Sequence, residues 1–166
     1  MGTAKDFHNL SARDLRLELE EVYAEYSGSI DDRDLDRWPE FFTEQCMYKI
    51  IPRENYRRGL PLAIWLSESK GMLKDRVVTI RQTSMYAPRY LRHLVSGIRV
   101  RGWEGETLDV QANYLVLETL MDDVTRIFNA GQYVDKLVEE EGRLKFREKL
   151  CVFDSIVVPN SLIYPI

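Results

Sequence analysis

Hydrophobic positions in the first part of the chain recur at intervals of three and four residues. This spacing predicts an amphipathic helix of about five turns, which Ser11 and Asp14 are expected to cap. Asp31 and Asp32 close this helix, and a short second helix is expected over residues 34–42. The apolar stripe of the first helix consists of Leu15, Leu19, Val22, Tyr23, Tyr26 and Ile30.

Shorter apolar runs follow this helical region. Residues 46–52 predict a strand that ends at proline, because proline cannot donate a hydrogen bond to a sheet. A polar connection over residues 53–59 comes next. A short strand is then expected over residues 60–66, and a helix over residues 69–78.

The rest of the chain has the character of a sheet. Apolar and polar residues alternate with a period of two, as in strands that bury one face. Turn sequences containing glycine or paired acidic residues separate successive segments. The predicted strands cover residues 91–103, 107–120, 123–139 and 143–157.

The last of these segments shows the alternation clearly. Its apolar residues Leu144, Phe146 and Leu150 are expected to face the core. The cations Lys145, Arg147 and Lys149 are expected to face solvent. Helices followed by a long antiparallel meander give the α+β class. A helix in the concave side of such a sheet forms a half-open cone, a shape that often holds a pocket.

Length and composition fit one domain over residues 1–166, with residues 1–10 expected to be a loose arm. The chain is 45% hydrophobic and 30% charged, with no linker or internal repeat. Its net charge of −4 gives no general attraction for nucleic acid or anionic membranes. No stretch approaches the roughly 20 apolar residues of a membrane span, and the first residues do not resemble a secretory signal. A cytoplasmic location is therefore expected.

Histidine and cysteine are too few and too widely spaced to predict a metal site. The chain holds only His8, His93, Cys46 and Cys151. A Rieske cluster needs two histidines and two cysteines, and a mononuclear iron site needs two histidines and a carboxylate. Since no two of these residues lie close together in sequence, we expect two reduced, partly buried thiols and neither metal nor cofactor on this chain.

One acid–base constellation can be assembled from the sequence. Asp31, Asp32 or Asp34 would act with His93 on a strand and Tyr48 opposite it, as an isomerase or dehydratase requires. The plainer interpretation is that the aspartates are solvated charges and that His93 is bonded locally. The spacing favours the plainer interpretation, because nothing in it forces these groups together.

Clusters of arginine with tyrosine, and an apolar last segment, are candidates for binding. Guanidinium groups beside aromatic rings can contact nucleic acid or the carboxylates of a protein, and an acidic chain favours the protein. The segment 157–166 either packs on its own sheet or, as we expect, lies in a subunit interface. The interface candidates are Arg53, Tyr56, Arg58, Arg89, Tyr90, Arg92, Tyr164 and Ile166.

Four stretches together resemble the small (beta) subunits of Rieske-type aromatic-ring-hydroxylating oxygenases. None is specific alone, but their order and spacing are, and they span nearly the whole chain. PRENY with GLPL, and the final YPI, look most like small subunits of salicylate 5-hydroxylase and related benzoate-type oxygenases. The stretches are DRWPEFF (36–42), YKIIPREN (48–55) with RGLPL (58–62), ESKGMLKDRV (68–77) with RH (92–93), and LCVFDS (150–155) with PNS (159–161) and YPI (164–166).

The resemblance implies an NTF2-like (cystatin-like) cone, with N-terminal helices packed on a long, curved, mainly antiparallel sheet. It implies a trimer of this chain joined to large (alpha) subunits in an α3β3 hexamer. The large subunit would hold the Rieske [2Fe–2S] cluster and the mononuclear Fe(II), with electrons arriving through a ferredoxin and a reductase. This chain would carry no cofactor and no catalytic residue, and the complex would hydroxylate an aromatic acid such as salicylate, as a mono- or dioxygenase.

Two other functions stay open at this point. One is a stand-alone isomerase or dehydratase of the same superfamily, which contains ketosteroid isomerase and scytalone dehydratase, with Asp31, Asp34 and His93 as its acid–base residues. The other is a binding module for a small hydrophobic ligand, suggested by the aromatic content of 11%.

Overall fold

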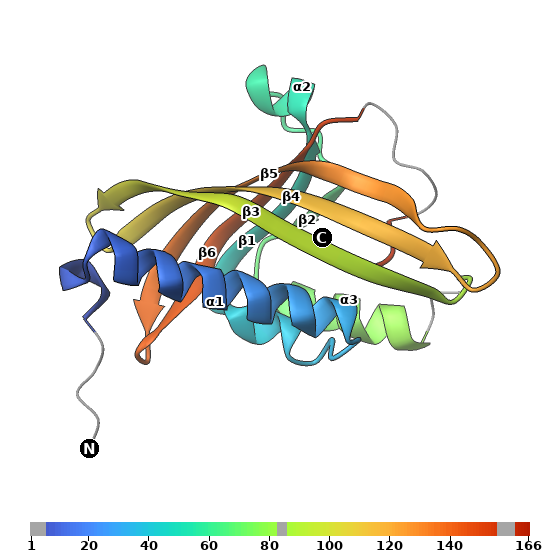
Figure 1. Cartoon of the computed structure of the whole chain (residues 1–166), viewed down its shortest axis with the longest axis horizontal. Coiled ribbons are helices and arrows are strands. Elements are labelled where there is room, and N and C mark those ends of the chain that lie inside the picture. Colours follow the sequence, from blue (N-terminus) through green and yellow to red (C-terminus); the bar gives the residue numbers. More distant parts are fainter. Residues whose placement is uncertain (1–5, 83–85, 156–161) are drawn as a thin grey trace.

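A long, curved sheet with helices along its concave side forms the molecule (Figure 1). The computed structural model describes residues 6–82, 86–155 and 162–166. Its sheet has six strands in the order β2-β1-β6-β5-β4-β3. The elements are η1 (Phe7–Asn9), α1 (Ala12–Asp31), η2 (Trp38–Phe41), β1 (Phe42–Pro52), α2 (Arg53–Arg57), β2 (Trp65–Ser67), α3 (Lys70–Gln82), β3 (Arg89–Glu104), β4 (Thr107–Leu120), β5 (Arg126–Glu140) and β6 (Arg143–Phe153).

The strands from β3 to β6 form the antiparallel meander that the alternation predicts. β1 pairs parallel to β6 and antiparallel to β2, so the sheet is mixed but mainly antiparallel. The α+β class and the NTF2-like architecture are thus confirmed. No helix among the described residues is both long enough and apolar enough to cross a membrane.

Helix α1 is the long first helix that the apolar periodicity of the sequence predicts. The hydroxyl of Ser11 accepts a hydrogen bond from the amide of Asp14 at 3.1 Å, which caps the first turn. The apolar stripe packs into the concave side of the sheet, where Figure 1 shows the helix lying. The buried members of the stripe are Leu15, Leu19, Tyr23, Tyr26 and Ile30.

Between α1 and β3 the structure departs from several expectations. The short helix over 34–42 is only the 3-10 turn η2, because β1 begins at Phe42 rather than at Cys46. The connection 53–59 contains the helix α2. The strand over 60–66 shrinks to β2, since Pro61 interrupts it, and the helix over 69–78 continues to Gln82.

The loose arm expected over residues 1–10 is wrong for residues 7–9. Phe7 is 2% exposed and belongs to the core. The ring of His8 stacks on Trp103, with centroids 3.7 Å apart. Asp6 accepts a hydrogen bond from the His8 amide and so caps the start of η1. Residues 1–5 of the predicted arm lie outside the described part.

A β-bulge reverses the faces of β6. Leu137 of β5 pairs with Phe146, but Lys136 pairs with Glu148, so β6 carries one extra residue, Arg147. Because side chains alternate along a strand, every later residue changes sides. Lys149, expected in solvent, is therefore fully buried in the cone, while Leu150, expected in the core, is only half-buried.

Candidate functional site

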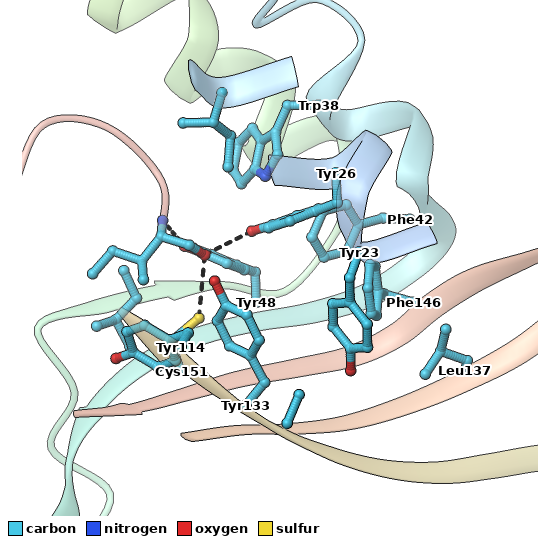
Figure 2. Packing of buried hydrophobic residues seen from close by; sticks show 14 of the residues in the cluster. Tyr23, Tyr26, Trp38, Phe42, Tyr48, Tyr114, Tyr133, Leu137, Phe146 and Cys151 are labelled. Atoms are coloured by element: carbon cyan, nitrogen blue, oxygen red, sulfur yellow. Dashed lines mark hydrogen bonds between the residues drawn. The ribbon is translucent and has the colours of Figure 1, made fainter. Parts of the chain in front are cut away.

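The concave side of the sheet is filled by aromatic side chains from helix and sheet. Figure 2 shows Tyr23 and Tyr26 of α1 facing Tyr48 and Tyr133 of the sheet. The rings meet mostly edge to face, the arrangement that aromatic quadrupoles favour. The rings of Tyr114 and Tyr133 are instead stacked, with centroids 4.4 Å apart and planes 17° apart.

The last residues of the sequence lie inside this aromatic cluster. The backbone oxygen of Ile166 accepts hydrogen bonds from the hydroxyls of Tyr26 and Tyr48 at 2.8 and 3.2 Å and from the thiol of Cys151 at 3.4 Å. Its amide donates to the Tyr48 hydroxyl at 2.8 Å. Ile166 is 0% exposed and Tyr164 is also buried. Tyr164 and Ile166 therefore pack on their own sheet, and their placement in a subunit interface is wrong.

Two further contacts fasten this tail, by which we mean residues 162–166. Arg76 of α3 donates to the carbonyls of Leu162 and Ile163 at 3.1 and 3.3 Å, and its guanidinium lies 4.3 Å from the ring of Trp65. The hydroxyls of Tyr86 and Tyr164 lie 2.6 Å apart. Residues 157–161 of the predicted interface segment lie outside the described residues.

A buried ion pair lies deeper in the cone. Lys149 donates to a carboxylate oxygen of Asp135 at 3.0 Å, and Tyr23 donates to the same oxygen at 2.7 Å. The ammonium of Lys149 also lies 3.4 Å from the centroid of Tyr133, a cation–π contact. Burial raises the pKa of Asp135, and the nearby ammonium opposes this shift. Sequence reasoning missed the pair because the bulge places Lys149 inside.

Asp31 and His93 are brought together, although the spacing did not require it. The end of α1 packs on β3, where Oδ1 of Asp31 lies 2.6 Å from Nδ1 of His93 and Oδ2 accepts the His93 amide at 2.9 Å. The imidazole is 0% exposed. Asp34 and Asp32 are exposed at the surface, and Tyr48 is engaged with Ile166, so only two members of the predicted constellation meet.

Some buried polar atoms near this pair have no hydrogen-bond partner in the described structure. They include Nε2 of His93 and Nδ2 of Asn129. The amide oxygen of Asn129 accepts a hydrogen bond from the hydroxyl of Tyr114 at 2.7 Å. Asn129 carries no sequence signal, because a single polar residue in a strand predicts nothing by itself.

Arg89, an interface candidate, is buried in the chain's own interior. Its guanidinium donates to the carboxylate of Glu118 at 2.6 Å, and both side chains are almost completely covered. The register of β3 on β4, which pairs Arg89 with Leu120 and Leu91 with Glu118, brings the two charges together. The prediction that Arg89 lies in a subunit interface is therefore wrong.

The other interface candidates lie at the surface. Tyr56 and Arg58 are exposed on and after α2, and Arg53 forms a partly exposed ion pair with Asp154. Tyr90, 58% exposed, and Arg92 point away from α1 on β3. Exposed apolar side chains accompany the candidates around α2 and those on β3. After α2 they are Leu60, Leu62, Ile64 and Leu66, and around the β4–β5 hairpin they are Met121, Val124 and Ile127.

Both thiols are free and buried, as expected for structural cysteines. Burial raises the pKa of Cys46 to about 11 and that of Cys151 to about 12, so neither is a nucleophile at neutral pH. Among the residues that the structure describes, no group of three or more histidine, cysteine or acidic side chains could hold a metal ion.

Comparison with known proteins adds an independent observation. The sequence model of the family described as "Ring hydroxylating beta subunit" matches residues 27–160. The small subunit of anthranilate 1,2-dioxygenase from Burkholderia cepacia is 36% identical, over 85% of this chain and 88% of its own length. The crystal structure of a beta subunit assigned to an aromatic-ring-hydroxylating dioxygenase from Novosphingobium aromaticivorans has a TM-score of 0.85 at 35% identity and covers 93% of this chain and 99% of its own. The beta subunit of benzoate 1,2-dioxygenase from Burkholderia mallei shares the fold, with a TM-score of 0.71 at 14% identity over 88% of this chain and 92% of its own.

Proposed function

This chain belongs to the family of ring-hydroxylating beta subunits, and we propose that it is the assembly subunit of a multicomponent aromatic oxygenase whose chemistry takes place on the large subunit. The observation that carries the proposal is the match over residues 27–160, which covers most of the chain. The resemblance carried by the four sequence stretches agrees with that match.

The interior of the cone supports an assembly role. In a stand-alone enzyme of this shape, the concave side would hold the substrate. Here the tail lies there, and its last backbone oxygen accepts hydrogen bonds from Tyr26, Tyr48 and Cys151. We therefore do not propose the isomerase or dehydratase that Asp31, Asp34 and His93 suggested, although Asp31 and His93 are paired.

The iron centres belong to the large subunit in this proposal. A Rieske [2Fe–2S] cluster and a mononuclear Fe(II) would both lie there, and a ferredoxin and a reductase would supply electrons. The small subunit would shape and stabilise the assembly without touching the substrate. We further propose an α3β3 hexamer located in the cytoplasm.

The contact surfaces of that hexamer would use the exposed candidates that remain. Arg53, Tyr56 and Arg58 lie beside the apolar residues 60–66, of which Leu62 is 74% exposed. Tyr90 and Arg92 lie on the outer face of β3, and Arg92 is in register with Leu117, which in turn pairs with Ile127. Apolar groups rimmed by arginine and tyrosine are typical of protein interfaces.

The relative and the resemblance both support an aromatic acid as the substrate class. The relative from Burkholderia cepacia belongs to an oxygenase named for anthranilate, which is an aromatic acid. We propose that the complex containing this chain hydroxylates an aromatic acid such as salicylate, in the breakdown of aromatic compounds.

Co-expression of this chain with a candidate large subunit tests the proposal. The expected product is a hexamer by light scattering, with iron and oxygenase activity in the complex and neither in this chain alone. Arg92→Glu should weaken the assembly, whereas Arg16→Glu, on the exposed face of α1, should leave it intact. A chain that stays monomeric and never binds a large subunit would overturn the proposal.

A further inference from the structure

Two buried nitrogen atoms of the cone have no hydrogen-bond partner among the described residues, and they lie in one row of the sheet. His93 pairs with Val116 of β4, and Val116 pairs with Asn129 of β5. Nε2 of His93 and Nδ2 of Asn129 are both buried with no hydrogen-bond partner in the described structure. Leaving buried polar groups unpaired is energetically costly, so two such atoms in one row of the sheet require an explanation.

Both side chains face the interior. His93 contacts Asp31 of α1, which lies on the concave side, and its imidazole is 0% exposed. Asn129 is held by the hydroxyl of Tyr114, whose ring stacks on Tyr133 in the core. Neighbouring strands lie about 4.8 Å apart, so the two backbones are roughly 10 Å apart across Val116. An imidazole and a carboxamide reaching over a valine can share one oxygen atom at that separation.

Asp31 defines what each nitrogen offers. Oδ2 of Asp31 accepts the backbone amide of His93 and Oδ1 lies 2.6 Å from Nδ1, so in the neutral imidazole the ring proton lies on Nδ1. Nε2 then presents a lone pair and accepts a hydrogen bond. The amide oxygen of Asn129 already accepts from Tyr114, so its NH2 group is the free donor.

A hydroxyl group satisfies both atoms, since its hydrogen can bond to Nε2 while its oxygen accepts from Nδ2. The neighbouring side chains on the same face of the sheet are aromatic or apolar, with Tyr114, Val116 and Leu91 all buried. We propose that the cone of this subunit holds a binding site for a small phenol, whose hydroxyl lies between His93 and Asn129. This inference rests on the geometry of the chain and not on its role in an oxygenase.

The site is closed in the structure described. Glu118 follows Val116 by two residues on β4 and pairs directly with Leu91, and its ion pair with Arg89 lies at the start of β3. The contact between Tyr86 and Tyr164 joins the tail to the segment before β3. Because both polar atoms are buried, we expect that neighbouring segments such as the tail must move before a phenol can enter, and that binding is slow.

The test uses the full chain labelled with 15N-histidine and phenol as the probe. The sequence has only two histidines, so His8, stacked on Trp103 at the far end of β3, is an internal control. Phenol, after long incubation, should shift the Nε2 resonance of His93 saturably and leave His8 unchanged. Toluene, which has the ring but no hydroxyl, should produce no such shift.

The variant Asn129→Asp provides a second test of the proposed site. This variant keeps an oxygen acceptor for Tyr114 but removes the free donor, and it should weaken phenol binding about tenfold or more. Asn113→Asp, at an exposed position of β4, should bind like the unmodified chain. The proposal is overturned if His93 does not respond to phenol, which would leave a bound water as the partner of both atoms. It is also overturned if toluene acts equally, or if Asn129→Asp binds phenol with undiminished affinity.

Discussion

The ammonium of Lys149 lies 3.0 Å from Oδ2 of Asp135, and both side chains are completely buried on the concave face. Each charge would be costly there without the other. Tyr23 donates a hydrogen bond to the same carboxylate oxygen, and four aromatic rings lie within 5.0 Å of the ammonium by their centroids. The pair therefore ties β5, β6 and α1 together at the centre of the cone.

Removing one member of this pair should destabilise the chain strongly. Asp135→Ala leaves the ammonium of Lys149 buried without its carboxylate, and we expect the free energy of unfolding to fall by about 3–5 kcal/mol. Urea unfolding followed by circular dichroism measures the change. The control is Glu54→Ala, which breaks the exposed pair with Arg58 and should have little effect. Equal losses in both variants would contradict a structural role for the buried pair.

The bonds between Tyr48 and Ile166 should contribute measurably to stability. Tyr48→Phe removes the hydroxyl that both donates to the Ile166 oxygen and accepts from its amide, and leaves those groups buried. A loss of about 1–3 kcal/mol in the free energy of unfolding is expected. Tyr90→Phe is the matched control, because Tyr90 is exposed. If the two variants unfold at the same urea concentration, the tail contributes nothing through Tyr48.

Two glycines should respond in opposite directions to the same substitution. A Cβ atom on Gly131 would lie 2.1 Å from the carbonyl oxygen of Val152, so Gly131→Ala must push β5 away from β6. A loss of about 1–3 kcal/mol or more is expected. Gly28 lies within α1 with nothing within 4 Å of its added Cβ, and Gly28→Ala should stabilise the helix by about 0.5–1 kcal/mol. Thermal unfolding of both variants gives the two signs, and a tolerated Gly131→Ala would refute the tight approach.

Local pattern predicted the elements of the fold far better than the contents of the cone. Strand β4 begins and ends where its alternation predicts, and α1 follows from its apolar stripe and its cap. Lys149 was misplaced because a bulge is an insertion in the pairing of two strands, which one strand's sequence does not reveal. Tyr56 and Arg58 are exposed, and their place in a subunit interface stays a prediction.

The contacts between segments that are distant along the chain were not predicted from the sequence. The pairing of Asp31 with His93 depends on where α1 crosses β3, and the burial of Ile166 depends on where the tail meets Tyr26 and Tyr48. Neither follows from spacing along the chain. The resemblance to small oxygenase subunits supplied the family, but it left these interior contacts unpredicted.

Stability should fall at alkaline pH because the cone buries groups that ionise there. Burial raises the pKa of Cys151 from its ordinary value of 9.0 to about 12, and the pKa values of Tyr26 and Tyr48 also rise well above normal. The unfolded chain then releases these protons at a lower pH than the folded chain does. The stabilisation is complete below pH 9 and is lost as the pH rises towards 12.

Urea unfolding between neutral pH and about pH 11 tests this expectation, because the free energy of unfolding should decline steadily above pH 9. Cys151→Ala removes one of the ionising groups and should make the decline shallower. Cys46→Ala is the matched control: its pKa is raised to a smaller extent, to about 11, and its removal should flatten the decline less. Identical slopes in all three proteins would mean that the thiol in the cone ionises as readily in the folded chain as in the unfolded one.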